Sequence, residues 1–160
     1  MATNKNSDFL KIVLERTNSN HSDFRHLVKL LDENLLEING SDIQAVYAEY
    51  NLIDFIETVV IAYANGAPAG CGCFKVFDSG TVEIKRMYVD KPYRQKGIAF
   101  KILNELEQWA KELGYTTAML ETGRRHHEAL ALYRKVGYAI TDNYGPYIGK
   151  EESICLRKLL

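Results

Sequence analysis

The segment from residue 82 to residue 114 constrains the fold most, because it joins a strand pattern directly to a helix pattern. Residues 82–89 alternate in polarity and are rich in β-branched and aromatic side chains, which is typical of a strand, and Pro92 ends it. The helix pattern that follows has apolar side chains along one side and Gly114 as a C-terminal stop. These apolar side chains are Ile98, Ile102, Leu106, Trp109 and Leu113. The order strand, turn, helix predicts a unit of a mixed α/β domain.

The turn between this strand and this helix carries two basic residues and a glycine, namely Arg94, Lys96 and Gly97. The first backbone amides of a helix have no partners inside the helix, and the helix dipole is positive at that end. Gly97 removes a side chain where an anion needs close approach to the backbone. The turn therefore predicts a binding site for a phosphate or pyrophosphate, with a helix start and a packing glycine as the alternative.

A length of 160 residues, with 46% hydrophobic and 26% charged residues, predicts one soluble globular domain over residues 1–160. Residues 1–8 are polar and are expected to fray. The net charge of −1 gives no overall attraction to nucleic acid or membranes, and no apolar run is long enough to span a bilayer. The chain has three cysteines, Cys71, Cys73 and Cys155. This small, odd number predicts reduced thiols and a cytoplasmic location, and we predict no metal site.

The remaining patterns give strands and helices without repeats or linkers. Helix patterns, the first capped by Ser22, alternate with strand patterns that are joined by polar turns. Three successive strands with short turns predict an antiparallel meander, and the strand after the long helix should lie parallel to the central strand. The strand patterns cover residues 9–15, 54–64, 69–77, 82–89, 116–122, 137–140 and 153–159, and the helix patterns cover residues 22–38, 41–50, 98–113 and 127–135.

Two motifs within this order resemble the signatures of the GNAT acetyltransferase superfamily. Arg94-x-x-Gly97-x-Ala99 follows the central strand and resembles the acetyl-coenzyme A signature of that superfamily. The segment from Ala129 to Tyr138 is similar to its second signature and lies one strand further on. The resemblance implies a single-domain GNAT fold of the α/β (α+β) class. Such a fold has a mixed, mostly antiparallel sheet flanked by helices, in the order β-α-α-β-β-β-α-β-α-β-β.

The resemblance also implies an acetyl-coenzyme A site, and residues 83–89 and 120–123 add a narrower likeness to small bacterial GNAT proteins. A bulge would splay the central strand from residues 116–122, and backbone groups would hold the pantetheine arm and the pyrophosphate. The contacts implied are Met87, Tyr88 and Val89 for pantetheine and Arg94, Gln95, Lys96, Gly97, Ile98, Ala99 and Phe100 for phosphate. His126 replaces an asparagine common in the superfamily, and it is a cofactor contact, a base with a pKa of ~6.5, or an exposed loop histidine.

Three residues are candidates for the chemistry of acetyl transfer. Tyr133 matches a tyrosine that protonates the leaving thiolate in many GNAT enzymes, since a phenol pKa of ~10 keeps it protonated; a core tyrosine is the alternative. Glu83 and Glu121 match the general bases of two branches of the superfamily, and the sequence slightly favours Glu83. A base needs a pKa raised toward neutrality by burial, whereas Lys85 would lower the pKa of Glu83. Either carboxylate could instead be a salt-bridged strand residue.

These observations predict an enzyme, an acetyl-coenzyme A-dependent N-acetyltransferase that acts by direct attack of an amine. The acceptor would be a primary amine of a small molecule, an amino acid or a protein. The alternative is a non-catalytic acyl-coenzyme A sensor or regulatory module of the same fold. The acceptor should bind between the first helices and the last hairpin, and the final strands offer a surface for a homodimer. Tyrosines in those segments either form a wall of the acceptor site or simply pack, and they are Tyr47, Tyr50, Tyr144 and Tyr147.

Overall fold

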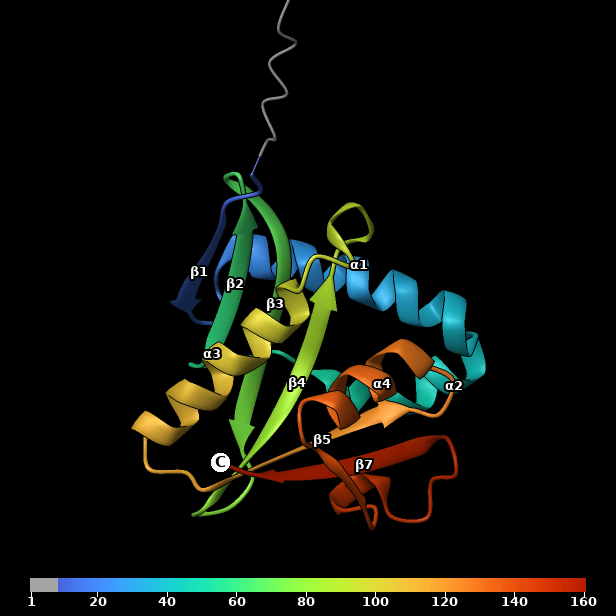
Figure 1. The fold of residues 1–160 in the computed structure, drawn as a ribbon. Coiled ribbons are helices and arrows are strands. Elements are labelled where there is room, and N and C mark those ends of the chain that lie inside the picture. The colour runs from blue at the N-terminus through green and yellow to red at the C-terminus, as the bar shows by residue number, and fades with distance from the viewer. Residues whose placement is uncertain (1–8) are drawn as a thin grey trace, which may run out of the picture.

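The computed structural model describes residues 9–160, so the predicted fraying of residues 1–8 lies outside the described residues. Its strands are β1 Ile12–Thr17, β2 Val59–Ala64, β3 Ala67–Val76, β4 Thr81–Val89, β5 Thr117–Gly123, β6 Ala139–Thr141 and β7 Ser153–Leu159. Its helices are α1 Ser22–Asn39, α2 Ser41–Tyr47, α3 Ile98–Glu112 and α4 His127–Lys135, with 3₁₀ turns at Ala48–Asn51, Lys91–Tyr93 and Gly145–Tyr147. This order confirms the predicted fold class and succession of elements (Figure 1).

Within residues 9–160 the strands form one seven-stranded sheet in the order β1-β2-β3-β4-β5-β7-β6. β2, β3 and β4 form the predicted antiparallel meander, while β5 lies parallel to β4 with Val82 opposite Ala118. The long helix α3 connects these two strands, as a parallel pair requires. β6 lies at the edge of the sheet with Ile140 exposed, and a homodimer through the last strands stays a prediction.

Helices cover both faces of this sheet, with α3 on one face and α1 on the other (Figure 1). The apolar side of α3 buries Ile98, Ile102 and Leu106 in one hydrophobic cluster. α1 buries Phe24 and Leu27 in a second cluster against β2 and β3. Each face therefore has its own core, and full burial of each large apolar side chain contributes roughly 1.5–3 kcal/mol.

The three cysteines are free and buried, and two of them belong to the α1 side of the sheet. The thiol of Cys71 donates to the carbonyl oxygen of Arg86 at 3.5 Å, and that of Cys73 donates to the carbonyl oxygen of Lys85 at 3.3 Å. Burial raises the pKa of Cys73 to about 12, so this thiol stays protonated and unreactive at neutral pH. These cysteines act as small core side chains, as the sequence predicts.

Two strands, β1 and β2, begin more than two residues later than predicted. The strand predicted over residues 54–64 begins only at Val59, because the preceding segment is tied to a loop instead of the sheet. The amide of Ser19 donates to the carbonyl oxygen of Ile56 at 2.8 Å, and the amide of Ile56 donates to the Ser19 hydroxyl at 3.1 Å. β1 is shifted to Ile12–Thr17 because this segment, and not residues 9–15, pairs in register with β2.

Two helix boundaries differ as well. α1 is capped by His21 and not by Ser22, since His21 Nδ1 accepts a hydrogen bond from the amide of Asp23 at 3.1 Å. α2 ends at Tyr47, and the chain continues to Asn51 as a 3₁₀ turn where the sequence predicts helix through residue 50. Both differences lie within one turn of a helix end, where a small change in capping moves the boundary.

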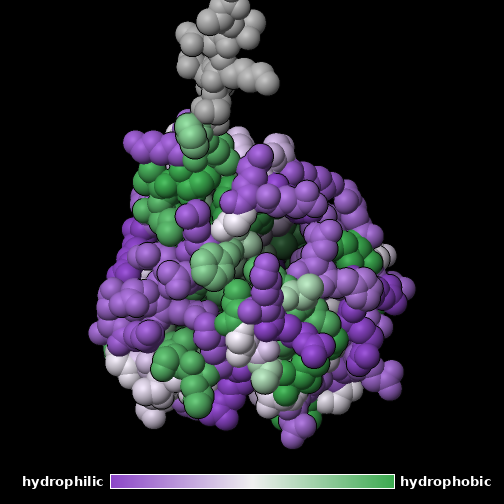
Figure 2. Space-filling model, viewed as in Figure 1, coloured by the Kyte–Doolittle hydropathy of each residue, from purple (hydrophilic) through white to green (hydrophobic). Residues whose placement is uncertain are grey.

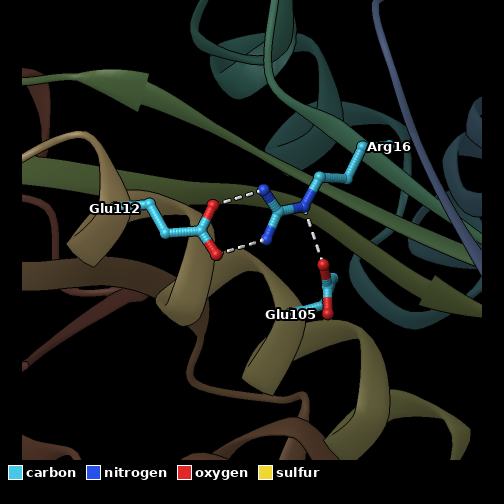
Figure 3. A network of polar contacts seen from close by, with 3 residues as sticks. All are labelled: Arg16, Glu105 and Glu112. Carbon is cyan, nitrogen blue, oxygen red and sulfur yellow. Dashed lines mark hydrogen bonds and ion pairs between the residues drawn. The ribbon is translucent and has the colours of Figure 1, made fainter.

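Arg16 on β1 joins the edge of the sheet to α3 (Figure 3). Its guanidinium donates two hydrogen bonds to Glu112, at 2.6 and 3.1 Å, and one to Glu105 at 2.7 Å. The same guanidinium lies 4.9 Å from the centre of the Trp109 ring. Arg16 contacts two carboxylates and one aromatic ring. Ordering its side chain therefore costs conformational entropy only once, although three contacts are gained.

Arg16→Met is therefore expected to lower the free energy of unfolding by about 1 kcal/mol, the upper range for solvent-accessible ion pairs. Urea denaturation measures the change, and 1 M salt should reduce it because these charges are partly exposed. Arg25→Met is the matched control, since Arg25 has one looser contact, 3.9 Å from Asp54. Equal effects of the two substitutions would show that the Arg16 contacts add nothing.

Candidate active site

A β-bulge interrupts β4 at the centre of the sheet. Cys71 pairs with Tyr88 and Cys73 pairs with Lys85, so two residues of β4 stand opposite one residue of β3. Arg86 lies in this bulge with a φ of 57°, which is rare outside glycine. β4 and β5 pair only as far as Ile84 and then diverge, as Figure 1 shows. The bulge and the splayed strand pair that the resemblance implies are both present.

A cavity of about 110 Å³ lies where the two strands diverge. It is lined from α1, α2, β4, β5 and α4, so five elements meet around it. In the space-filling view a hollow at this position has apolar side chains at its bottom and polar side chains around its rim (Figure 2). Its ionisable or polar lining residues include Lys85, Arg86, Glu121, His126 and Tyr133. Four predicted site residues, Met87, Glu121, His126 and Tyr133, are therefore brought together here.

Glu121 has the acid–base properties that a base at neutral pH needs. Burial raises its pKa to about 7, although the Ser153 hydroxyl and the charge of Lys85 lower it. Its neighbour in the cavity, Tyr133, is buried in α4, and burial raises the pKa of that phenol well above its ordinary value. Glu121 therefore exchanges a proton near pH 7, whereas Tyr133 keeps its proton and remains a hydrogen-bond donor.

Glu83 has a different environment. It accepts a hydrogen bond from the Tyr144 hydroxyl at 2.8 Å, and its other oxygen lies 3.6 Å from the Lys85 ammonium. The same ammonium donates to the Tyr147 hydroxyl at 3.1 Å. Both oxygens of Glu83 are thus engaged by donors that stabilise its charged form. This arrangement is the salt-bridged alternative that the sequence left open for this carboxylate.

The turn before α3 leaves its first amides accessible. Gly97 is the N-cap of α3 and is left-handed, with a φ of 77°, and Gln95 has a φ of 62°. A Cβ built on Gly97 would meet nothing within 4 Å, so there is open space above the helix start. Arg94 donates from Nε to the carbonyl oxygen of Val89 at 2.8 Å and packs over the Tyr88 ring, so its side chain holds the turn against β4. These features fit an anion bound by backbone amides.

The predicted tyrosine wall is largely a packed cluster. Tyr47 stacks on Tyr147 with 6.3 Å between ring centres, and Tyr50 and Tyr144 meet Tyr147 edge to face. Tyr147 is buried, whereas Tyr47 lines the cavity and shares a 2.6 Å hydrogen bond with the Ser153 hydroxyl. Only Tyr47 of the four thus contributes to the cavity wall among the residues that the structure describes.

His126 occupies the position just before α4 and lines the cavity. Burial lowers the pKa of its imidazole, so the ring is neutral at pH 7. This residue is partly buried, which argues against the exposed loop histidine of the sequence analysis. Its contact with a cofactor stays a prediction.

The cavity also contains residues that sequence reasoning did not place there, above all Lys85 and Arg86. Their side chains are 7% and 2% exposed, which is unusual for charged groups. The signal in the sequence is two adjacent basic residues that break the alternation of a mostly apolar strand. Adjacent residues of a regular strand point to opposite faces, and only the bulge brings both to the same cavity.

No group of three or more His, Cys, Asp or Glu side chains within residues 9–160 is placed to hold a metal ion. Of the helices in that range, none combines the length and the apolar character that crossing a bilayer requires.

Fold and site together define an acyltransferase-type α/β domain, with a bulged central strand that diverges from its parallel neighbour over a helix start. The sequence model described as "Acetyltransferase (GNAT) family" matches residues 24–138, which is more than half of the chain. The chain therefore belongs to the GNAT acetyltransferase family.

One similar protein is an IAA acetyltransferase from Azospirillum brasilense, which is 33% identical over 102 residues. That match covers 63% of this chain and 67% of the relative. The chain spans 57% and 62% of the length of two further relatives, from Xenopus tropicalis and Bacillus subtilis. The curated relatives thus extend beyond the matched part.

Solved structures of similar fold cover nearly the whole chain. A Klebsiella pneumoniae protein assigned as an acyl-CoA N-acyltransferase is 26% identical with a TM-score of 0.79, and the match covers 93% of this chain and 97% of that one. The PaiA N-acetyltransferase of Thermoplasma acidophilum, solved in complex with coenzyme A, is 18% identical with a TM-score of 0.69. That match covers 94% of this chain and 99% of the other, and at this identity it supports the fold alone.

Proposed function

We propose that the protein transfers an acetyl group from acetyl-coenzyme A to a primary amine. The observation that carries the proposal is the pairing of Glu121, whose pKa is raised to about 7, with the buried phenol of Tyr133 in one cavity. A base that ionises near pH 7 and a donor that is protonated at neutral pH are the two groups that amine acetylation needs. Membership of the GNAT family supports the same reaction.

The cosubstrate would bind from the α3 side of the sheet. The amides of residues 95–100 would hold the pyrophosphate, since the turn at Gly97 leaves open space above them. The edge of β4 from Met87 to Val89 has no ladder to β5, because pairing ends at Ile84. Backbone groups on this edge that neither β5 nor Arg94 engages would hold the pantetheine arm in the manner of an added strand. A protein of similar fold was solved in complex with coenzyme A, so this fold can accommodate the cosubstrate.

The chemistry balances with the residues of the cavity. The amine nitrogen attacks the thioester carbonyl carbon, a C–N bond forms, and the C–S bond breaks to release coenzyme A as a thiolate. The proton lost by the amine goes to Glu121, directly or through a water molecule. Tyr133 donates a hydrogen bond and then its proton to the sulfur, and it regains a proton from solvent. The products are an N-acetylated amine and the free thiol of coenzyme A.

We place Glu121, and not Glu83, as the base, because the two carboxylates differ in environment. Glu121 has a raised pKa and lines the cavity, whereas the oxygens of Glu83 are engaged by Tyr144 and Lys85. This proposal reverses the slight preference of the sequence analysis for Glu83. The three free, buried thiols support the reducing, cytoplasmic location that the sequence predicts.

Calorimetry with coenzyme A and thiol release from acetyl-coenzyme A over a panel of amines test the proposal together. Binding with turnover supports an enzyme. Binding without turnover on any amine would indicate a non-catalytic acyl-coenzyme A sensor. Absence of binding at millimolar coenzyme A would contradict both.

Tyr133→Phe is expected to lower kcat roughly 10- to 100-fold and leave coenzyme A affinity unchanged, because only the donor to the leaving sulfur is lost. Tyr138→Phe is the matched control, since the Tyr138 ring lies 6.0 Å from that of Tyr133 and its hydroxyl donates to Glu107 instead. The control should lower stability by about 1 kcal/mol and leave kcat unchanged. Equal kcat values for the wild type and Tyr133→Phe would rule out the donor role.

A further inference from the structure

Arg86 is a buried cation that lines the cavity with part of its hydrogen-bonding capacity unused. Its side chain is 2% exposed, and one terminal nitrogen, Nη2, pairs with Asp32 of α1. Its Nε is buried without a hydrogen-bond partner among the described residues. A buried donor without a partner costs about 1–3 kcal/mol, so natural proteins retain one only for a reason.

The position of Arg86 suggests that this reason is a ligand. The residue lies in the bulge at a φ of 57°, and the sheet tolerates this strained backbone at the point where β4 leaves β5. Such strain is typical of functional sites. The bulge interrupts the alternation of side chains in β4, and both Lys85 and Arg86 line the cavity at this point.

The carboxylate that pairs with Arg86 lies on the solvent-exposed side of α1. The Asp32 side chain is 55% exposed on the surface of α1, so water can solvate it when the pair opens. The partner of Lys85 is different, because Glu83 is 14% exposed and is also held by Tyr144. Arg86 can thus exchange its partner at small cost, while Lys85 keeps its own.

We infer that Arg86 receives the carboxylate of the acceptor, and that the acceptor is a small amine that carries a carboxylate, such as a free amino acid. The inference rests on the proposed function. The acceptor's amine would lie toward Glu121 and its carboxylate toward Arg86, with both groups on the wall of one cavity. Asp32 holds the guanidinium when no acceptor is bound. Arginine is suited to this task because its planar fork matches a carboxylate.

The size and charge of the cavity agree with this acceptor. A volume of about 110 Å³ is several times the roughly 10–15 Å³ that one water molecule requires, so a molecule of a few heavy atoms fits. Glu152, which also lines the cavity, lies 3.5 Å from exposed Arg125, so its charge is partly balanced at the rim. A protein N-terminus has an amide where a free amino acid has a carboxylate, so the inference separates these two classes of acceptor.

The test compares free amino acids with their amides as acceptors, using thiol release from acetyl-coenzyme A. The wild type is expected to prefer the acid over the matched amide by roughly 10-fold or more in kcat/KM, the size of one charge-assisted hydrogen-bond pair. Arg86→Gln should abolish this preference. Asp32→Asn should keep or increase it, because the guanidinium loses its competing partner.

Arg86→Gln and Asp32→Asn should change the acid-to-amide preference differently, although the two residues form one ion pair. This difference distinguishes a role in acceptor binding from a structural role. A purely structural pair predicts equal losses of stability in Arg86→Gln and Asp32→Asn, with the acid-to-amide ratio unchanged, and that result would overturn the inference. If Arg86→Gln does not fold, the acid-to-amide ratios of kcat/KM for the wild type and for Asp32→Asn test the inference instead. Arg25→Gln, on the exposed side of α1, is the control and should change nothing.

Failure of the inference can be told apart from failure of the proposed function. Turnover of amides or of carboxylate-free amines at equal or higher efficiency overturns the acceptor assignment but supports acetyl transfer. No turnover of any amino acid overturns the assignment as well. Failure of the proposed function itself is recognised by the absence of coenzyme A binding in calorimetry, or by binding without turnover on any amine, with or without a carboxylate.

Discussion

Gly97→Glu is expected to lower the affinity of the protein for coenzyme A at least ~100-fold, because it removes several charge-assisted contacts at once. The glutamate would occupy the open space above the helix start, where no protein atom lies within 4 Å of a Cβ. It would place a negative charge where the amides of α3 would receive a pyrophosphate. Isothermal calorimetry with coenzyme A measures the loss directly.

The matched control is Gly114→Glu at the other end of the same helix. Gly114 is also left-handed, with a φ of 92°, and a Cβ there also meets nothing within 4 Å. Both substitutions therefore impose a similar backbone strain of about 1 kcal/mol. Only the Gly97 variant should lose coenzyme A affinity. Equal affinities of the two variants would contradict a pyrophosphate site at the start of α3.

Much of the fold could be predicted because its elements follow simple periods. α4 and β7 agree with the predicted residues 127–135 and 153–159, and α3 differs by one residue at its end. The segment before Val59 has a strand-like pattern because Ile56 is an apolar residue that is buried. In the structure this residue is buried in a loop and not in a strand. Sequence patterns report burial, and they do not report which backbone partner satisfies the amides.

The candidate site could be predicted only in part. Gly97 and Tyr133 are visible in the sequence because local motifs contain them. The choice between Glu83 and Glu121 depends on tertiary environment, since Tyr144 reaches Glu83 from 61 residues away. The sequence does not reveal Arg86 as a site residue, because the position of its side chain depends on one extra residue in β4. Such a bulge leaves no periodic pattern in the sequence.

Glu121→Gln is expected to lower kcat/KM by roughly 100-fold or more, the usual contribution of a positioned general base. Glutamine keeps the shape of the side chain but cannot accept the proton of the amine. Glu83→Gln is the matched control and is expected to lose less than about 5-fold, because its partners Tyr144 and Lys85 remain and the base is intact. A larger loss in the Glu83 variant would assign the base to Glu83.

The pH dependence of the same variants gives an independent test of Glu121. Its pKa is raised from 4.5 to about 7, so the active carboxylate form increases as the pH rises through 7. Wild-type kcat/KM should therefore show a rise centred near pH 7 that comes from this carboxylate. Ionisation of the acceptor amine adds a rise of its own near pH 8. Because Glu121→Gln retains only that second rise, the difference between the two profiles isolates the carboxylate.

The stability of Glu121→Gln should change in the opposite sense to its activity. The pKa of Glu121 is higher in the folded chain than in the unfolded chain, so ionisation favours unfolding, and stability falls as the pH rises through about 7. Glutamine cannot ionise, so the variant should be more stable than the wild type by roughly 1–2 kcal/mol at pH 8 and about equal to it at pH 5. Urea denaturation at the two pH values checks this. A variant that is less stable at pH 8 would mean that the ionised carboxylate is held by donors, and a base held in that way would not titrate near neutrality.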